Sequence, residues 1–524
     1  MHPIPHQPDT ARARSHDDAA LCTPQARPWV LANSILASGM VFVDGTVVNV
    51  ALPALQQAFD SGVAGAQWVV EAYALLLTAL LLLGGAMGDR YGRRRVFAGG
   101  VLVFGAASVG CGLARTIDGL IWARALQGVG GALLVPGSLA LISAAFPEQL
   151  RGKAIGTWSG WTAITAAVGP VLGGFLIEHL SWRYAFLVNI PFVLAVLVLT
   201  FRHVPESRSG GGGRLDWTGA LLASLALGGL VYGLIEAPAR GWRDAGVVAS
   251  LALAALALAA FVIAERRHPA PLLPLALFRV RAFSAANLLT LLLYAALGAL
   301  MFFLPLDLIW VQGYTATQAG AALVPFILIM FALSGWAGGL VDRHGARLPL
   351  VLGPSIAAAG FAAFMLPGAG GSYWTTFFAP ILVLGFGMAV TVAPLTTTVM
   401  NALDAAHAGL SSAINNAVSR AAGLLAIALL GIVMQRAYDA ELGRRIAAVP
   451  LSAAVRVQLD AQHGKLAAPA LPPSTAPADR ARVQEAVAAA FVHGFRWVMG
   501  ISALLALGSA GCAWAMLGRT RTRG

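Results

Sequence analysis

ALLLTALLLLGGAMGDRYGRRR, residues 74–95, decides the fold, because a long apolar run ends abruptly in a glycine-rich, charged segment. An α-helix rises 1.5 Å per residue, so about 20 apolar residues cross a hydrocarbon core of roughly 30 Å. Roughly fourteen stretches of about this length recur along the 524-residue chain. Backbone groups in lipid must be satisfied within each segment, so the sequence predicts an all-α integral membrane protein.

The charge of the chain is sparse and basic. Charged residues make up 11% of the sequence and hydrophobic residues 58%, whereas soluble chains are about 25% charged. The net charge is +12, yet Lys and Arg lie mostly in short connections between apolar runs. This is the positive-inside distribution, so we expect contact with a lipid bilayer and no nucleic-acid partner. It predicts a multi-pass protein of the inner (cytoplasmic) membrane with both termini in the cytoplasm.

The apolar runs form two groups of six with two additional runs between them. The expected spans are 29–50, 67–88, 96–114, 118–142, 154–177, 184–202, 217–236, 245–264, 282–306, 318–341, 348–367, 374–400, 409–435 and 490–517. The expected parts are a cytoplasmic tail at 1–28, a half at 29–202, a linker with the two additional spans at 203–281, a half at 282–517 and a cytoplasmic tail at 518–524. The second half includes an outer loop at 436–489, whose spacing is helical from Asp479 onward.

Five residues of the opening stretch recur 253 positions later with every spacing kept. The two sets are Gly85, Asp89, Arg90, Gly92 and Arg94, and Gly338, Asp342, Arg343, Gly345 and Arg347. Many secondary transporters build two halves around a central site from parallel repeats of this kind. The repeat therefore predicts a transporter whose halves rock about a central cavity.

Several motifs resemble those of the major facilitator superfamily, in particular its fourteen-helix drug:proton antiporter branch. Residues 85–95 resemble the signature of loop 2–3, residues 124–131 the fourth-helix motif, and residues 169–174 the fifth-helix motif of antiporters. Residues 43–53 and 182–191 are similar to motifs of the fourteen-helix branch. The resemblance implies a major facilitator fold, and it implies export in exchange for protons.

Three charges lie within the predicted spans at similar depth in the outer half of the membrane. They are Asp44 in the first span, Glu71 in the second and Arg124 in the fourth. A charge in hydrocarbon costs at least about 2.5–3.5 kcal/mol, so it usually faces a cavity or a partner. We expect a network in which Asp44 exchanges a proton for a cationic solute, and the resemblance assigns Arg124 to the proton-coupling machinery. The alternatives are a buried carboxyl that holds nearby backbone, a permanent ion pair, and a solvated carboxylate at Glu71.

Two further charged positions admit two interpretations each. Asp307, near the outer end of the ninth span, attracts the solute or is simply solvated at the interface. Arg420 follows Asn415 and Asn416 in the thirteenth span, where polar side chains bond across helices or line the cavity. We favour packing for this polar group.

The charged loop after residue 84 is expected to act as a gate. Asp89 would stabilise a helix N-terminus by about 0.3–1 kcal/mol, and breaking this contact would loosen the inner seal. Determination of topology is the plainer alternative. The expected gate residues are Gly85, Asp89, Arg90, Gly92, Arg93, Arg94, Asp342 and Arg343. The fifth-helix motif, expected to bend and seal, consists of Gly169, Pro170, Gly173 and Gly174.

The sequence therefore predicts proton-driven export of drugs or other small amphipathic, often cationic solutes. The alternatives are an exporter of a specific endogenous metabolite or siderophore and an uptake symporter. We find no phosphate-binding loop, nucleophile–base pair or Cys/His metal spacing, so we expect no enzyme activity, cofactor or metal. A periplasmic adaptor protein is a further expected partner.

Overall fold

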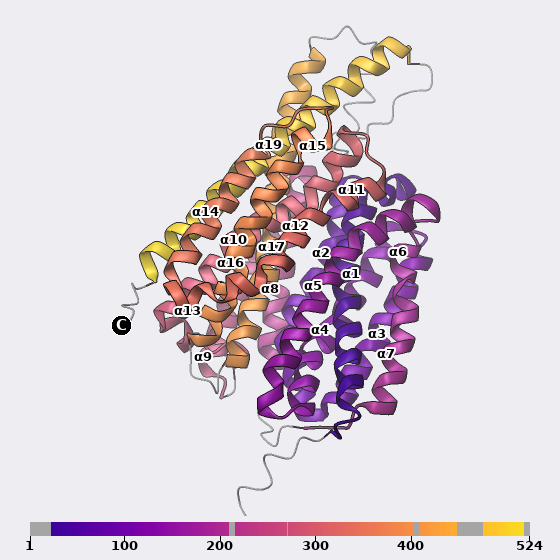
Figure 1. The fold of residues 1–524 in the computed structure, drawn as a ribbon. Coiled ribbons are helices and arrows are strands. Elements are labelled where there is room, and N and C mark those ends of the chain that lie inside the picture. Colours follow the sequence, from indigo (N-terminus) through magenta and orange to yellow (C-terminus); the bar gives the residue numbers. More distant parts are fainter. Residues whose placement is uncertain (1–21, 209–214, 270, 403–407, 448–474, 518–524) are drawn as a thin grey trace, which may run out of the picture.

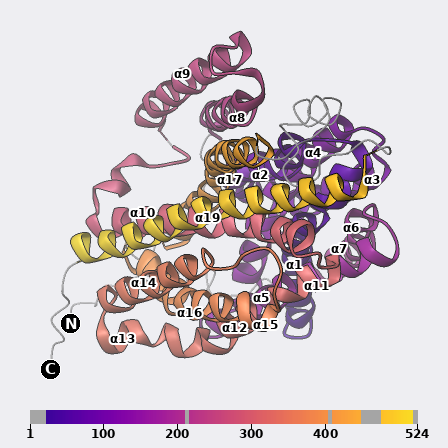
Figure 2. The ribbon, with the colours of Figure 1, turned by 90° about the horizontal axis from the view of Figure 1, so that it is seen from above.

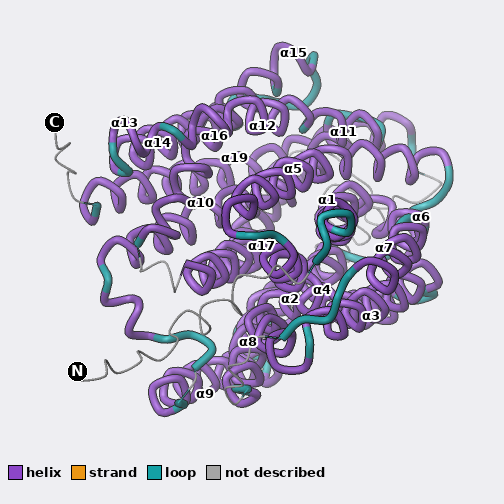
Figure 3. Tube along the Cα trace, turned by 60° about the horizontal axis from the view of Figure 1, so that its bottom comes forward, coloured by secondary structure: helices purple, strands orange, loops and turns teal. Residues whose placement is uncertain are grey.

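The computed structural model of the chain describes residues 22–208, 215–269, 271–402, 408–447 and 475–517. The described residues form helices joined by short connections, with no strand among them (Figure 3). Four expected parts lie wholly or partly outside the described residues: the tail at 1–28, the linker at 203–281, the outer loop at 436–489 and the tail at 518–524.

The first half of the chain forms a bundle whose helices match the first six expected spans. They are α1 (Arg27–Phe59), α2 (Val63–Tyr91), α3 (Arg93–Leu113), α4 (Ile117–Ala145), α5 (Glu148–His179), α6 (Tyr184–Leu187) and α7 (Asn189–His203). The short α6 and α7 together make the sixth span. The two additional helices are α8 (Trp217–Arg240) and α9 (Ala245–Arg267).

The second half repeats this plan with more interruptions. Its elements are the 3-10 helix η1 (Leu275–Arg279), α10 (Arg281–Leu306), the π-helical turn η2 (Asp307–Val311), α11 (Ala316–Ala322), α12 (Val324–Gly338), α13 (Leu340–His344), α14 (Arg347–Ala363), α15 (Tyr373–Thr376), α16 (Phe378–Asn401), α17 (Ala408–Ala447) and α19 (Pro477–Met516). Both α17 and α19 extend well beyond the expected spans. The helical spacing predicted from Asp479 onward is confirmed in α19.

Each of the fourteen expected spans coincides with a helix or with a pair of consecutive helices. Among the described residues, 12 helices are long and apolar enough to cross a membrane, some of them merged from consecutive elements. The other two are α14, which has only 17 residues, and α5. The fold is therefore the all-helical membrane bundle predicted, with 12 clear spans and 14 when these two are included.

Local sequence signals set where several helices begin and end. The Thr116 hydroxyl accepts the backbone N–H of Gly119 at 3.1 Å, and the Asp216 and Asp244 carboxylates cap α8 and α9 in the same way. Such N-caps satisfy donors that a first helical turn leaves unpaired. Helix α2 ends at Gly92, whose φ of 110° is readily adopted only by glycine.

The internal repeat seen in the sequence is also a repeat of packing. In the first half α1 packs on α5, α2 on α4, and α3 on both α4 and α7. In the second half α10 packs on α17, α12 on α16, and α14 on both α16 and α19. The turn glycine recurs as well, because Gly345 ends α13 with φ of 74°. The predicted architecture of two six-helix halves is confirmed.

The two halves meet along two seams. In the hairpin of α8 and α9, α8 lies beside α2 and α17 at the seam between them, and α9 packs on the outer side of α8 (Figure 2). Leu75, Val231 and Leu424 share one buried apolar cluster there. At the other seam α5 contacts α11 and α12. We call the end of the bundle where α17 ends and α19 begins the long-loop end, and the opposite end, where α1 begins, the tail end (Figure 1).

Candidate functional site

The candidate site centres on Asp44, near the middle of α1. Its side chain is fully buried. The Oδ2 atom accepts a hydrogen bond from the Arg124 guanidinium of α4 at 2.6 Å. The Oδ1 atom accepts from the side-chain amides of Gln127 at 2.8 Å and Asn189 at 3.0 Å. Three donors surround one carboxyl group, so the geometry suits a negatively charged carboxylate.

Arg124 is held as closely as its partner. Its side chain is 1% exposed. Its Nε atom donates to the Val69 carbonyl oxygen at 3.0 Å, and its Nη1 atom also donates to the Gln127 Oε1 atom at 2.6 Å. The guanidinium lies 4.2 Å from the centroid of the Tyr73 ring. A desolvated cation–π contact of this kind stabilises by about 2 kcal/mol. Asp44 is the carboxylate that neutralises this buried cation.

Ser108 of α3 completes the network. Its hydroxyl oxygen accepts from the Gln127 amide at 2.8 Å and from the Asn189 amide at 3.2 Å. The network therefore connects α1, α3, α4 and α7. Removing one partner of a buried ion pair costs about 3–5 kcal/mol, because the other charge is left without compensation. A change of charge at Asp44 acts on four helices at once.

The structure brings together two of the four charges proposed from the sequence. Asp44 and Arg124 form the expected pair. Glu71 lies outside the network: it is fully buried on α2, and neither of its carboxylate oxygens has a hydrogen-bond partner among the described residues. Asp307 lies in the other half, at the start of η2, where its Oδ2 atom accepts from the Gln312 amide at 3.2 Å.

The loop after α2 differs from the expected contact. Asp89 pairs with Arg93 at 2.7 Å and, within the described part of the chain, accepts no backbone N–H. Glu206 meets the start of α3 instead, because its Oε1 atom accepts the backbone N–H of Arg94 at 3.0 Å. A Cβ atom at Gly92 would lie 2.7 Å from the same carboxylate oxygen, so glycine leaves room for Glu206. The helix N-terminus receives a carboxylate, but from the segment after α7.

The other expected gate residues lie at the same end of the bundle. Gly85 faces α4, where a Cβ atom would lie 3.5 Å from Pro136. Arg90 and, in the second copy, Arg343 are exposed. Asp342 lies on α13, and its side chain is outside the described part of the structure. The repeat therefore places two similar charged turns at the tail end.

The fifth-helix motif brings α5 against α1 beside Asp44. A Cβ atom at Gly169 would overlap the Thr46 hydroxyl, and one at Gly173 would lie 2.8 Å from a Val47 methyl group. Both contacts are on the turn of α1 that follows Asp44. Small residues at such positions let membrane helices approach closely. A shift of α1 at Asp44 is therefore transmitted directly to α5.

The same motif also faces the other half. A Cβ atom at Gly174 would overlap the carbonyl oxygen of Ala316 on α11, and one at Gly320 would overlap the carbonyl oxygen of Pro170. The Thr317 backbone N–H donates to the Glu178 carboxylate at 3.3 Å. These contacts close the α5–α11 seam at the long-loop end.

A second contact between the halves lies at the same end of the α2–α17 seam. The Gln67 amide donates to the Ile427 carbonyl oxygen at 3.2 Å. A Cβ atom at Gly431 would overlap this amide nitrogen, so the close approach of α2 and α17 needs glycine there. Both seams are therefore joined toward the long-loop end.

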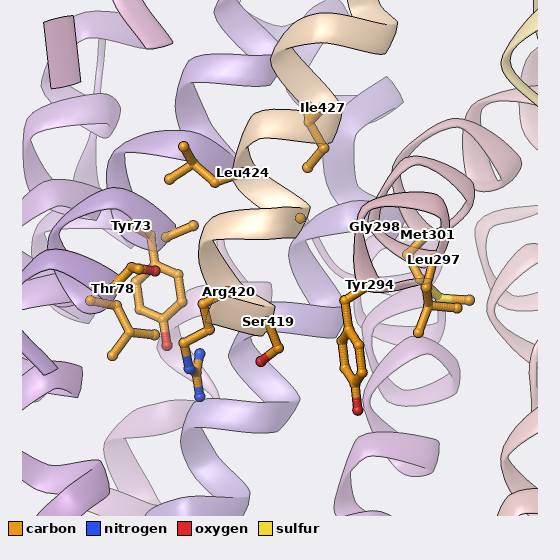
Figure 4. A pocket seen from close by; sticks show the side chains of 13 residues that line it. Tyr73, Thr78, Tyr294, Leu297, Gly298, Met301, Ser419, Arg420, Leu424 and Ile427 are labelled. Atoms are coloured by element: carbon orange, nitrogen blue, oxygen red, sulfur yellow. The ribbon is translucent and has the colours of Figure 1, made fainter. Parts of the chain in front are cut away.

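Between these contacts and the tail end, a cavity of 240 Å³ separates α2 from α10 and α17. Arg420 reaches into it from α17, and Tyr73 lies across from it on α2 (Figure 4). Neighbouring Asn415 donates to Asn287 at 3.2 Å and to Thr290 at 2.7 Å, both on α10. The polar group of α17 thus does both things considered from the sequence: Asn415 bonds across helices and Arg420 lines the cavity.

A larger hollow of 700 Å³ lies at the seam of α5 with α11 and α12. Its lining is apolar apart from Thr317. Phe175 and Leu328, which line it, are about half exposed, as is normal for side chains that face lipid. Among the described helices, no pair packs over this seam as α8 and α9 do at the other one.

Sequence reasoning missed three residues of these sites. Ser108 is a single hydroxyl in an apolar run, and Tyr73 is one aromatic residue among many. Glu206 lies in the segment at 203–281, which the sequence predicts to be a linker. Gln127 and Asn189 belonged to quoted motifs but received no role. Among the described residues, no group of three His, Cys, Asp or Glu side chains is placed to hold a metal ion.

Comparison with known proteins adds a family. The sequence profile of the Major Facilitator Superfamily matches residues 34–427. The multidrug resistance protein Stp of Mycobacterium tuberculosis is 36% identical over 416 residues, which cover 76% of this chain and 75% of that protein. The tetracenomycin C resistance and export protein of Streptomyces glaucescens is 34% identical, with 78% and 76% covered. The drug efflux pump JefA of M. tuberculosis is 31% identical over 507 residues, covering 95% and 99%.

Solved structures share the fold. One is a bacterial homologue of the human lysosomal transporter Spinster in an inward-facing, occupied conformation, with a TM-score of 0.64, 17% identity and coverage of 94% of this chain and 97% of that chain. Another is the D-xylose–proton symporter, with a TM-score of 0.60, 14% identity and coverage of 94% and 98%. At such low identity the likeness describes the architecture alone.

Proposed function

Because this chain belongs to the major facilitator superfamily, we propose that it exports drugs or other small amphipathic solutes in exchange for protons. It is a multi-pass membrane transporter of small molecules rather than an enzyme. The names of its relatives, which include a multidrug resistance protein and a drug efflux pump, support drug export. The proposal of proton coupling is supported by the geometry of the site around Asp44.

The observation that carries the proposal is the fully buried ion pair of Asp44 and Arg124. Protonation of Asp44 removes the negative charge that neutralises Arg124. An unpaired guanidinium in the low-dielectric interior costs several kcal/mol, so the surrounding helices rearrange until another acceptor or water reaches it. Tyr73 packs against the Arg124 guanidinium and also lines the cavity between the halves. Protonation of Asp44 therefore affects Tyr73, which is part of the cavity wall, through the contact between Tyr73 and Arg124.

The same event reaches the contact between the halves through two helix interfaces. Asp44 lies on the face of α1 next to the residues that touch Gly169 and Gly173 of α5. Gly174, the residue directly after Gly173 on α5, lies against Ala316 of α11 in the other half. A small displacement of α1 therefore loosens or tightens the seam at the long-loop end. We propose that this seam opens when Asp44 is protonated from outside and closes when it deprotonates inside.

At the tail end, the charged turns act as the opposing gate in this proposal. Opening that end changes the pair of Asp89 with Arg93 and the cap that Glu206 places on α3. The halves that move are residues 29–202 and 282–517, with 203–281 as the linker that carries α8 and α9. The proposed gate residues remain Gly85, Asp89, Arg90, Gly92, Arg93, Arg94, Asp342 and Arg343.

The proposal places the protein in the inner membrane with both termini in the cytoplasm, as the distribution of Lys and Arg favours. A periplasmic adaptor protein is a further proposed partner. Export of one endogenous metabolite or siderophore is the second candidate, and an uptake symporter is the third. A buried carboxyl serves all three. The names of the relatives favour export, and a panel of unrelated dyes separates the first two candidates.

The test is energised transport into inverted membrane vesicles, with Asp44→Asn compared with the parent and with Asp118→Asn. Asp118 is an exposed carboxylate in the first turn of α4, so it controls for the loss of one acid. We expect the parent and Asp118→Asn to accumulate several dyes until a protonophore is added. Asp44→Asn should show no proton-dependent uptake. Equal proton-dependent transport in all three proteins would remove Asp44 from the coupling role.

A further inference from the structure

We infer that the cavity between α2, α10 and α17 binds the solute through a negatively charged group, with Arg420 as the residue that selects for it. The inference rests on the proposed transport function and names the class of solute. It differs from the preference for cations expected from the sequence. It follows from the charge and unpaired hydrogen-bonding groups that line the cavity.

Both halves contribute to the wall of this cavity, as the proposed movement of the halves requires of a binding site for the solute. Its lining consists of Tyr73, Ala74, Leu77 and Thr78 from α2, Tyr294, Leu297, Gly298 and Met301 from α10, and Ser419, Arg420, Gly423, Leu424 and Ile427 from α17. Its volume of 240 Å³ exceeds the roughly 150 Å³ that suffices for a benzene molecule. It therefore admits a small aromatic solute with one polar group.

Of the described residues that line the cavity, Arg420 is the only one with a charged side chain. Among the described residues, no carboxylate forms an ion pair with it. Asp44 and Glu71 are not lining residues, and Asp44 is already paired with Arg124. The wall of the cavity therefore carries a positive charge that no carboxylate in the described part of the chain compensates. A charge at this depth needs a partner, which a negatively charged solute supplies.

Two of the lining residues on α2 also carry hydroxyl groups. The Tyr73 and Thr78 hydroxyl oxygens are buried, and neither has a hydrogen-bond partner among the described residues. Buried polar groups are normally paired, so these two hydroxyls have hydrogen-bonding capacity left for a polar group of a solute. Arg420 on α17 and Tyr73 on α2 lie next to each other in the wall of the cavity (Figure 4). Two hydroxyls and a guanidinium suit a carboxylate, sulfonate or phenolate, while the apolar remainder of the wall suits an aromatic ring.

The test measures equilibrium binding to the purified full chain in nanodiscs without any gradient. The probes are 2-naphthoate and 2-naphthylmethylammonium, which share a ring system and carry opposite charges at pH 7.5. We expect the parent to bind the anion about tenfold more tightly than the cation, in keeping with one charge-assisted contact. Arg420→Gln should weaken binding of 2-naphthoate about tenfold and leave binding of the cation unchanged or stronger.

Two variants keep the result interpretable. Arg420→Lys retains the charge and should keep the preference for the anion. Arg266→Gln removes an exposed arginine at the end of α9, outside the cavity, and should bind both probes like the parent. If Arg420→Gln loses both probes, Arg420→Lys decides: retained binding of the anion supports the proposal, and its loss overturns it. A parent that prefers the cation, or an Arg420→Gln variant that retains the parent's preference, also overturns it. Because binding needs no proton gradient, failure here is distinct from failure of the coupling proposal.

Discussion

Replacing either member of the Asp44–Arg124 pair alone should destabilise the protein about as much as replacing both, because each single change leaves a buried charge without its partner. Arg124 is 1% exposed and lies 2.6 Å from Asp44, so Asp44→Asn leaves a buried guanidinium without its carboxylate. We expect Asp44→Asn and Arg124→Gln each to lower the free energy of unfolding by about 3 kcal/mol, the lower end of the range for a broken buried pair. The double variant has no unpaired charge and should lose about the same amount, which gives a coupling of about 3 kcal/mol.

The assay is equilibrium unfolding of the purified chain in mixed micelles titrated with SDS, followed by helix content. Glu441 and Arg445 provide a control cycle, because they lie as close, at 2.7 Å, but Arg445 is 47% exposed. Exposed pairs couple weakly, so the control cycle should be nearly additive. Additivity within about 0.5 kcal/mol for Asp44→Asn and Arg124→Gln would refute the reasoning, since independent sites behave in that way.

Three further substitutions test the contacts around the site. Gly174→Val should abolish dye transport because a side chain there overlaps α11, whereas Gly156→Val on the same helix meets nothing within 4 Å and should transport normally in the vesicle assay. Gly92→Ala should slow transport, because the backbone φ of 110° at this position costs an L-residue about 1–2 kcal/mol and Glu206 occupies the space that the new methyl group needs. Gly99→Ala is the control: a Cβ atom there meets nothing within 4 Å, so this variant should transport normally. Asn415→Leu should lower stability by about 0.6–1.7 kcal/mol in the SDS titration, the value of interhelical hydrogen bonds in membranes.

The positions of the helices could be predicted from the sequence because lipid imposes a minimum length of apolar residues on each span. The charged residues within the spans could also be recognised, because a charge in hydrocarbon is costly and therefore rare. Asp44 and Arg124 each stand among apolar residues. Depth in the membrane follows from counting residues along a helix. This is why the pair, which lies at one depth on two helices, could be proposed before any coordinates.

The direction in which a side chain points around its helix is less accessible. Glu71 shares the depth of Asp44, but its side chain does not reach the network, and only the packing of α2 shows this. Ser108 and Tyr73 carry no charge that distinguishes them in an apolar run, although they connect the network to α3 and to the cavity. Glu206 caps α3 from more than a hundred positions away in the sequence, so no local sequence pattern predicts this contact.

The solute preference shows the same limit. The sequence favoured cations because the buried acid at Asp44 was the most prominent group. The structure pairs this acid with Arg124 and leaves Arg420, which was interpreted mainly as packing, as the charge that faces the cavity. Which charged side chains pair with one another depends on the distances between helices, and these distances cannot be deduced from the amino-acid composition.

Exchange of protons for solute through Asp44 is tested most directly in proteoliposomes that contain a pH indicator and hold the membrane voltage at zero. A solute gradient imposed without any pH difference should drive protons in the opposite direction in the parent and in Asp118→Asn. It should move no protons in Asp44→Asn. Solute-driven proton movement of equal size in Asp44→Asn, or solute flux without proton movement in the parent, would contradict the account.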